Sequence, residues 1–195
     1  MTTLLRFISC TAIVCLTLIS TGCSVDNWEE TRKLTYTSNY VPVEFAFPSG
    51  WTLNTNEHPY DLQCFSPQRD MQCGIFVFKR EDLEEGQTAK KIFDLQIEDI
   101  RSKRENFKEL DSRSNLTFEG KEITVAPFSA DKDGDTNHYT FSLVEFKDNP
   151  EVFAILLQVA IPESRSESKS TFLKIARSAK LAKSSEAPIA TEPQK

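Results

Sequence analysis

The sequence predicts an α+β domain in which an antiparallel β-sheet is flanked by helices. Three observations favour this class. β-like runs of apolar residues occupy both halves of the chain, one long stretch near the middle has a helical period, and a second helical stretch follows the last β-like run. Helices that come between and after groups of antiparallel strands typically pack on the faces of one sheet.

Composition and charge set the size of the domain and exclude one class of partner. The chain has 195 residues, 39% hydrophobic and 27% charged, which fits one globular domain with short flanking pieces. It carries 29 acidic and 23 basic side chains, a formal net charge of -6, and the two signs are interleaved. Because nucleic-acid binding needs clustered positive charge to neutralise phosphates, we expect no nucleic-acid partner.

The first β-like runs lie between Val41 and Phe78. The domain is expected to begin near Val41, and Val43 to Phe47 alternates with its large apolar side chains on one face. Pro48 to Trp51 then forms a turn. A pair of strands follows, and its second member, Gly74 to Phe78, is rich in β-branched and aromatic residues.

A long amphipathic helix is predicted from Thr88 to Phe107. Apolar residues recur there at steps of three and four, with Lys, Glu and Arg on the other face. The apolar positions are Ala89, Ile92, Phe93, Ile97, Ile100 and Phe107.

Four further β-like runs follow this helix, separated by Gly, Asp, Asn and Pro turn residues. They are Leu116–Phe118, Glu122–Phe128, His138–Phe146 and Val152–Ile161. The last is almost entirely apolar, as a central strand covered on both faces would be. Ser164 and Glu167 then have the spacing of a capping box and predict a closing helix.

The N-terminus reads as an export signal that ends at a cysteine. Arg6 supplies a positive charge, and Phe7 to Ile19 is apolar but too short for a span of about 20 apolar residues. Ser20 to Cys23 resembles the lipobox of bacterial lipoproteins, in which the cysteine becomes the lipid-modified first residue. Residues 1–22 are therefore predicted to be a lipoprotein signal peptide; the alternatives are an uncleaved anchor or an ordinary signal peptide.

Lipid on Cys23 would attach the mature chain to a membrane, because two or more acyl chains anchor stably where one does not. The polar segment 23–40 then reads as a lipidated tether, 41–182 as one sandwich domain, and 183–195 as a disordered tail. The protein would face the periplasm from the cell membrane or the outer membrane. Ser24 lacks the Asp that commonly retains lipoproteins in the inner membrane, which favours the outer membrane.

Two cysteines would be left in the mature domain besides Cys23. Cys64 and Cys73 flank a turn, and an even number of cysteines in an oxidising compartment favours a disulfide. The alternative is a metal site that includes His58. The spacing does not fit it, because thiolate zinc sites usually have close C-x(2–4)-C pairs.

A family resemblance follows from the element order and from the run "VEFAFPSGW", a strand that enters Pro-x-Gly-Trp. Together with the ending "FLKIARSAKL", it is similar to the PsbP-like superfamily, including bacterial envelope lipoproteins of the DcrB type. The resemblance spans about Val43 to Leu181. It implies an α/β/α sandwich and a non-enzymatic accessory or binding role, with Cys23 as the only functional residue that carries over.

No catalytic constellation or cofactor motif is recognisable in the sequence. His58 and His138 are the only imidazoles, no nucleophile motif surrounds a serine, and six glycines provide no phosphate loop. An uncharacterised hydrolase is the enzymatic alternative. We expect no cofactor.

The acidic stretch Asp131 to Asn137 has two interpretations. Asp131, Asp133 and Asp135 alternate as in the start of an EF-hand calcium loop, but Thr136 replaces the expected glycine and Ser142 the expected twelfth-position glutamate. A hairpin turn is the interpretation we favour, and weak calcium binding is the alternative.

Two functional hypotheses stand on these observations. The favoured one is a membrane-anchored, non-enzymatic accessory module that binds another envelope protein. The other is a lipoprotein that binds a small ligand or, weakly, calcium.

Overall fold

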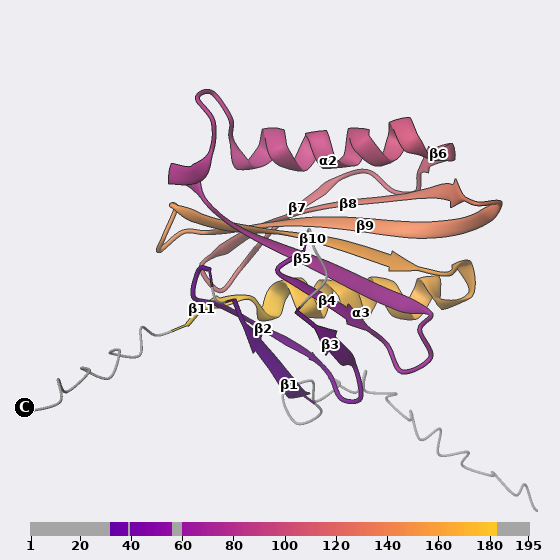
Figure 1. The fold of residues 1–195 in the computed structure, drawn as a ribbon, viewed down its shortest axis with the longest axis horizontal. Helices are drawn as coiled ribbons and strands as arrows, with labels where there is room; N and C mark the ends of the chain where they lie inside the picture. The colour runs from indigo at the N-terminus through magenta and orange to yellow at the C-terminus, as the bar shows by residue number, and fades with distance from the viewer. Residues whose placement is uncertain (1–31, 39, 56–59, 183–195) are drawn as a thin grey trace, which may run out of the picture.

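The structure is a computed structural model, and it describes residues 32–38, 40–55 and 60–182. These residues form two antiparallel sheets and two α-helices (Figure 1). The elements are β1 (Arg32–Thr37), β2 (Val43–Pro48), β3 (Thr52–Asn54), β4 (Leu62–Phe65), β5 (Met71–Lys79), α2 (Ala89–Lys103), β6 (Glu105–Glu109), β7 (Ser114–Phe118), β8 (Lys121–Lys132), β9 (Asp135–Phe146), β10 (Val152–Ala160), α3 (Arg165–Ser178) and β11 (Lys180–Leu181), with 3₁₀ turns η1 (Arg80–Asp82) and η2 (Pro162–Ser164).

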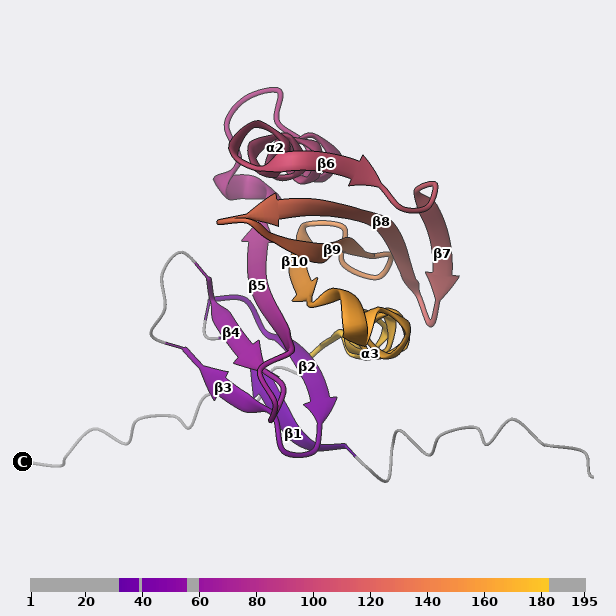
Figure 2. The same cartoon turned by 90° about the vertical axis from the view of Figure 1, so that its right-hand side faces the viewer.

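The larger sheet has eight strands in the order β3-β4-β5-β10-β9-β8-β6, and β7 pairs with another part of β8. Every pairing is antiparallel. Figure 2 shows α2 on one face of this sheet, and α3 with the small β1-β2-β11 sheet on the other. This confirms the predicted α+β class with an antiparallel sheet between helices.

Two hydrophobic cores result, one on each face of the large sheet. The first packs α2 against β8, β9 and β10 through Ala89, Phe93 and Ile97, the buried stripe that the helical period predicts. The second fills the space between the sheet, β2 and α3. β10 contributes alternate residues to both cores, as predicted for a central strand, and Phe153 and Leu156 are fully buried on opposite faces.

The predicted helix from Thr88 to Phe107 is too long at its C-terminal end. The Thr88 side chain caps the helix by accepting a hydrogen bond from the Lys91 amide, and the helix ends at Lys103. Asn106 then has φ 52°, and Phe107 belongs to β6. The Phe107 ring stacks on Phe128 of β8 with centroids 4.7 Å apart, so this apolar side chain packs against the neighbouring strand of the sheet.

The folded part also begins before Val41. Arg32–Thr37 is a strand that pairs with β2, although 23–40 was predicted to be a tether. The Tyr36 hydroxyl donates a hydrogen bond to the Asp61 carbonyl at 3.0 Å, which fixes this strand to the start of β4. The predicted signal peptide 1–22 and tail 183–195 lie outside the described residues. Among the described helices, none is long and apolar enough to cross a membrane.

Candidate functional site

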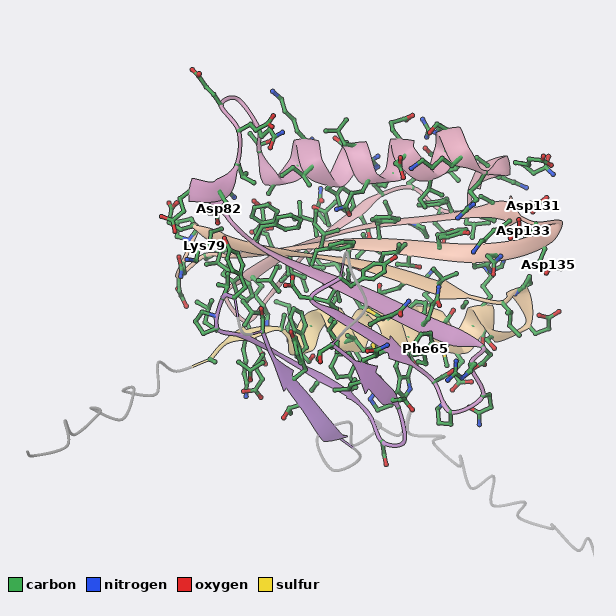
Figure 3. The ribbon with its side chains drawn as sticks, viewed as in Figure 1. Phe65, Lys79, Asp82, Asp131, Asp133 and Asp135 are labelled. Atoms are coloured by element: carbon green, nitrogen blue, oxygen red, sulfur yellow. The ribbon has the colours of Figure 1, made fainter. Side chains whose placement is uncertain are left out.

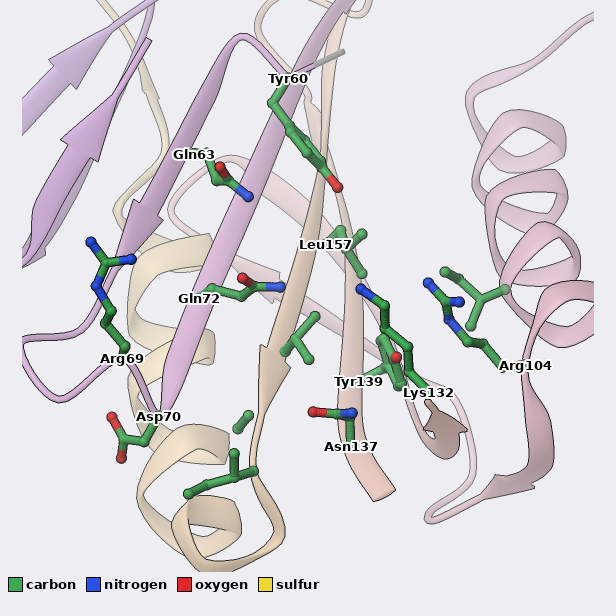
Figure 4. A pocket seen from close by; sticks show the side chains of 14 residues that line it. Tyr60, Gln63, Arg69, Asp70, Gln72, Arg104, Lys132, Asn137, Tyr139 and Leu157 are labelled. Carbon is green, nitrogen blue, oxygen red and sulfur yellow. The ribbon is translucent and has the colours of Figure 1, made fainter. Parts of the chain in front are cut away.

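A cavity of about 430 Å³ lies on the α2 side of the large sheet, where the helix ends and leaves β4 and β5 uncovered. Figure 4 shows the strands forming its floor and the end of α2 forming one wall. Apolar side chains of the floor and rim are Ile100, Leu157, Val159, Ala160 and Ile161. Uncharged polar side chains are Tyr60, Gln63, Gln72, Asn137 and Tyr139. This volume is within the range of small-ligand sites, but the lining is more polar than such sites usually are.

The charged lining of the pocket is mostly positive. Arg69 comes from the β4–β5 turn, Arg104 follows α2, and Lys132 ends β8. Among the described residues, none of the three forms an ion pair with a carboxylate, whereas Arg80, Arg101 and Arg113 do. Asp70 is the only acidic residue among the described residues of the lining, so these residues carry a formal charge of +2 in a chain of net charge -6.

Arg104 lies beside Tyr139 in the pocket lining and has an unused donor. Burial raises the pKa of Tyr139 more than the nearby Arg104 lowers it, so this phenol stays neutral. The Nε atom of Arg104 is buried and has no hydrogen-bond acceptor among the described residues. An unsatisfied buried donor costs about 1–3 kcal/mol, and a ligand acceptor would remove that cost.

Asp70 has a structural role at the rim. Its carboxylate accepts hydrogen bonds from the Ser66 and Ser164 hydroxyls, each at 2.5 Å. The Ser164 bond, followed by the Ser66 bond, lowers the pKa of Asp70, so the group is ionised. Because both oxygens are engaged, the carboxylate ties the β4–β5 turn to the start of α3 and is a poor candidate for a general base.

Tyr60 forms another wall because Gly74 makes room for it. A Cβ atom at position 74 would lie 2.3 Å from Tyr60 Cε1, so the ring can cross β5 only over a glycine. The ring also packs on Phe76 with centroids 4.8 Å apart.

Cys64 and Cys73 are directly opposite each other in the β4–β5 register. In the structure both are buried free thiols, and the Cys64 thiol donates to the Cys73 carbonyl at 3.3 Å. Directly opposed residues have Cα atoms about 4.5–5.5 Å apart, which a disulfide can span. The disulfide stays a prediction. Cys23 and His58, the latter from the alternative metal site, lie outside the described residues.

The acidic stretch 131–137 forms the β8–β9 hairpin turn, with Asp133 at φ 56° and Gly134 at φ 90°. These two positive angles are those of a type I′ turn, the interpretation favoured from the sequence. The carboxylate of Asp131 accepts hydrogen bonds from Asn106 and Thr136, which lower its pKa. Figure 3 shows Asp131, Asp133 and Asp135 at the tip of the hairpin. No group of three or more metal-binding side chains occurs among the described residues.

Sequence reasoning missed the pocket cations. Arg69, Arg104 and Lys132 are far apart in the sequence, and no motif links them. They are distinguished by the lack of a carboxylate partner among the described residues, which only the three-dimensional structure reveals. The second imidazole, His138, is on β9, outside the pocket lining.

Comparisons with known proteins identify the fold. No protein-family model and no curated protein matches the sequence. The solution structure of cyanobacterial PsbP from Synechocystis sp. PCC 6803 is similar, with a TM-score of 0.57 and 14% identity over 77% of this chain and 93% of that chain. LpqN of Mycobacterium tuberculosis, described as involved in cell envelope biogenesis, has a TM-score of 0.56 and 14% identity over 73% of this chain and 84% of its own.

The Ran-binding protein Mog1p of Saccharomyces cerevisiae is also similar, with a TM-score of 0.51 and 10% identity over 77% of this chain and 96% of that chain. The chain therefore has a Mog1p/PsbP-like fold. This agrees with the resemblance found in the sequence at the level of the fold; identities of 10–14% show nothing finer.

Proposed function

We propose that this protein is a lipid-anchored accessory module of the cell envelope that binds another envelope protein and is not itself an enzyme. The observation that supports this best is the pocket, whose three cations have no ion-pair partner in the described part of the chain. Its charged groups suit the binding of an anionic group. Among its described lining residues there is no serine or cysteine nucleophile, and their one carboxylate, that of Asp70, is engaged by Ser66 and Ser164.

The location rests on two further observations. Ser20 to Cys23 resembles a lipobox, so the mature protein would be held by lipid on Cys23, facing the periplasm and preferentially in the outer membrane. The fold is also that of LpqN, whose description places it in cell envelope biogenesis.

A small-ligand lipoprotein is the second candidate, because the cavity of about 430 Å³ has an apolar floor as well as polar groups. The calcium version of this candidate has less support, since Asp131 is already engaged by Asn106 and Thr136.

Chemical cross-linking in intact cells, followed by mass spectrometry, tests the proposal with the full-length tagged protein. A single envelope protein should be captured by the wild-type chain and lost with Cys23→Ala. Reproducible absence of any protein partner would contradict the proposal and favour the small-ligand candidate.

A further inference from the structure

We propose that the cationic pocket is the docking site for an acidic segment of the partner, with a carboxylate bound between Arg104 and Lys132. This inference rests on the proposed function and specifies the partner's chemistry. Figure 4 shows both side chains reaching into the same pocket beside Tyr139.

Charge is the first argument. The three cations outweigh Asp70, and they also outweigh the partial negative charge of about one half at the C-terminal end of α2. The chain as a whole has a net charge of -6, and Asp131 and Asp135 lie next to and opposite Lys132 in the β8–β9 hairpin, so the attraction of an acidic partner is confined to the pocket itself. Such a charge distribution directs an acidic partner to the pocket and also disfavours partners without negative charge.

The unused donor of Arg104 is the second argument. Its Nε–H is buried and has no acceptor among the described residues. A planar guanidinium with a free N–H matches the geometry of a carboxylate. Lys132, which lacks an ion pair in the described chain, adds a flexible second charge.

The rim favours a protein segment over a phosphate compound. Tyr60, Arg69 and Ile161 also line the pocket, and Ile161 is 41% exposed. Tyrosine and arginine are the residues that dominate binding energy in protein interfaces. Phosphate sites commonly use a helix N-terminus, whereas the helix end beside this pocket is the C-terminus of α2.

Zero-length cross-linking with a carbodiimide tests this in cells, because it joins a lysine amine directly to a carboxylate. The full-length protein should yield a peptide that joins Lys132 to an Asp or Glu of the captured envelope protein. Lys132→Gln should abolish that peptide, and Arg104→Gln should lower its yield at least fivefold. Lys147→Gln is the matched control, since Lys147 lies beyond the opposite end of β9 and pairs with Glu122 at 2.8 Å.

The outcomes separate the two proposals. Capture of the same partner through other lysines, unchanged in Lys132→Gln and Arg104→Gln, would overturn the docking site and leave the accessory function standing. If the wild-type protein captures no envelope protein at all, the proposed accessory function itself is wrong. Both variants are first checked for an unchanged melting temperature. A wild-type melting temperature raised by inorganic phosphate, and not in Arg104→Gln, would overturn the inference in favour of a phosphate ligand.

Discussion

Cys64 and Cys73 are the residues whose chemistry can be tested most directly. Their thiols are buried on facing strands, and a bond between them would close a loop that stabilises by roughly 2.5–3 kcal/mol. Protein extracted from the membrane fraction without reductant should contain no free thiol in a denaturing Ellman assay. Two free thiols there would contradict the disulfide.

The same pair predicts a pH dependence that differs between redox forms. Burial raises the pKa of the Cys64 thiol well above its ordinary value of 9.0. Above that value the unfolded chain loses the proton while the folded chain keeps it, so reduced protein should lose stability as the pH rises past about 9. Urea unfolding at pH 7 and pH 10 should show a larger loss in the reduced form than in the oxidised form, which has no such proton. Equal losses would contradict this.

The packing of the Tyr60 ring over Gly74 in the pocket wall can be tested by mutation. Gly74→Ala places a methyl group against the Tyr60 ring, and such overpacking should cost about 1–3 kcal/mol in unfolding free energy. The control is the same substitution made in a Tyr60→Ala protein. There the methyl group at position 74 meets no ring, so Gly74→Ala should lower the unfolding free energy by less than half as much. Chemical denaturation of the four proteins measures the coupling; equal costs in both backgrounds would show that the ring is not the obstacle.

Single residues also show why the pocket could not be predicted from sequence. Ser164 and Glu167 have the spacing of a capping box, but the Ser164 side chain makes no capping hydrogen bond. It donates instead to Asp70, 94 positions away, and so helps to build the pocket rim. A local sequence pattern shows which nearby hydrogen bond a hydroxyl can make. Long-range packing decides whether the hydroxyl makes that bond or a different one.

At the level of elements, α3 ends on a buried lysine. The Lys121 ammonium donates to the Arg177 and Ala179 carbonyls, each at 2.7 Å, and its side chain is 6% exposed. Lys121→Met would leave these carbonyls without a donor and should cost about 1–3 kcal/mol. Thermal unfolding measures the loss. Lys147→Met, which breaks an exposed ion pair, is the control and should change stability by less than about 0.5 kcal/mol; equal losses would rule out a capping role.

β1 predicts where the independently folding unit begins. A chain that starts at Val41 lacks this strand, exposes one edge of β2 and loses the Tyr36 contact with Asp61. We expect it to be less stable by at least about 2 kcal/mol, roughly 4–8 °C in melting temperature, than a chain starting at residue 24. Differential scanning calorimetry of the two chains checks this, and identical melting temperatures would place the boundary at Val41 after all.

The elements that sequence reasoning found are those with a strong period. α2, β8, β9 and β10 alternate or repeat over 9 to 15 residues, and each was predicted within a few residues at its ends. β1 and β6 are short and polar, with charged residues among their six and five positions. They form because a neighbouring strand offers hydrogen bonds, which is information that their own sequences do not contain.

At the scale of the whole molecule, the pocket and the proposed anchor would have different roles, namely partner selectivity and local concentration. Uncompensated positive charge in one cavity of an acidic chain provides selectivity for a partner, but a module that diffuses freely meets a membrane-bound partner rarely. Attachment to the same membrane raises the local concentration of both without any new contact. The anchor should therefore matter for function and not for folding.

Cys23→Ala separates these two roles. The variant should leave the membrane fraction for the soluble periplasmic fraction, because no acyl chain can be attached and burial of methylene groups supplies the anchoring energy. Its described domain is unchanged, so its melting temperature should match that of the wild type within about 1 °C by circular dichroism. It should nevertheless fail to complement a deletion of the gene. Full complementation by the soluble variant would show that the membrane is not part of the mechanism, and a variant that stays in the membrane fraction would show that another segment provides the anchor.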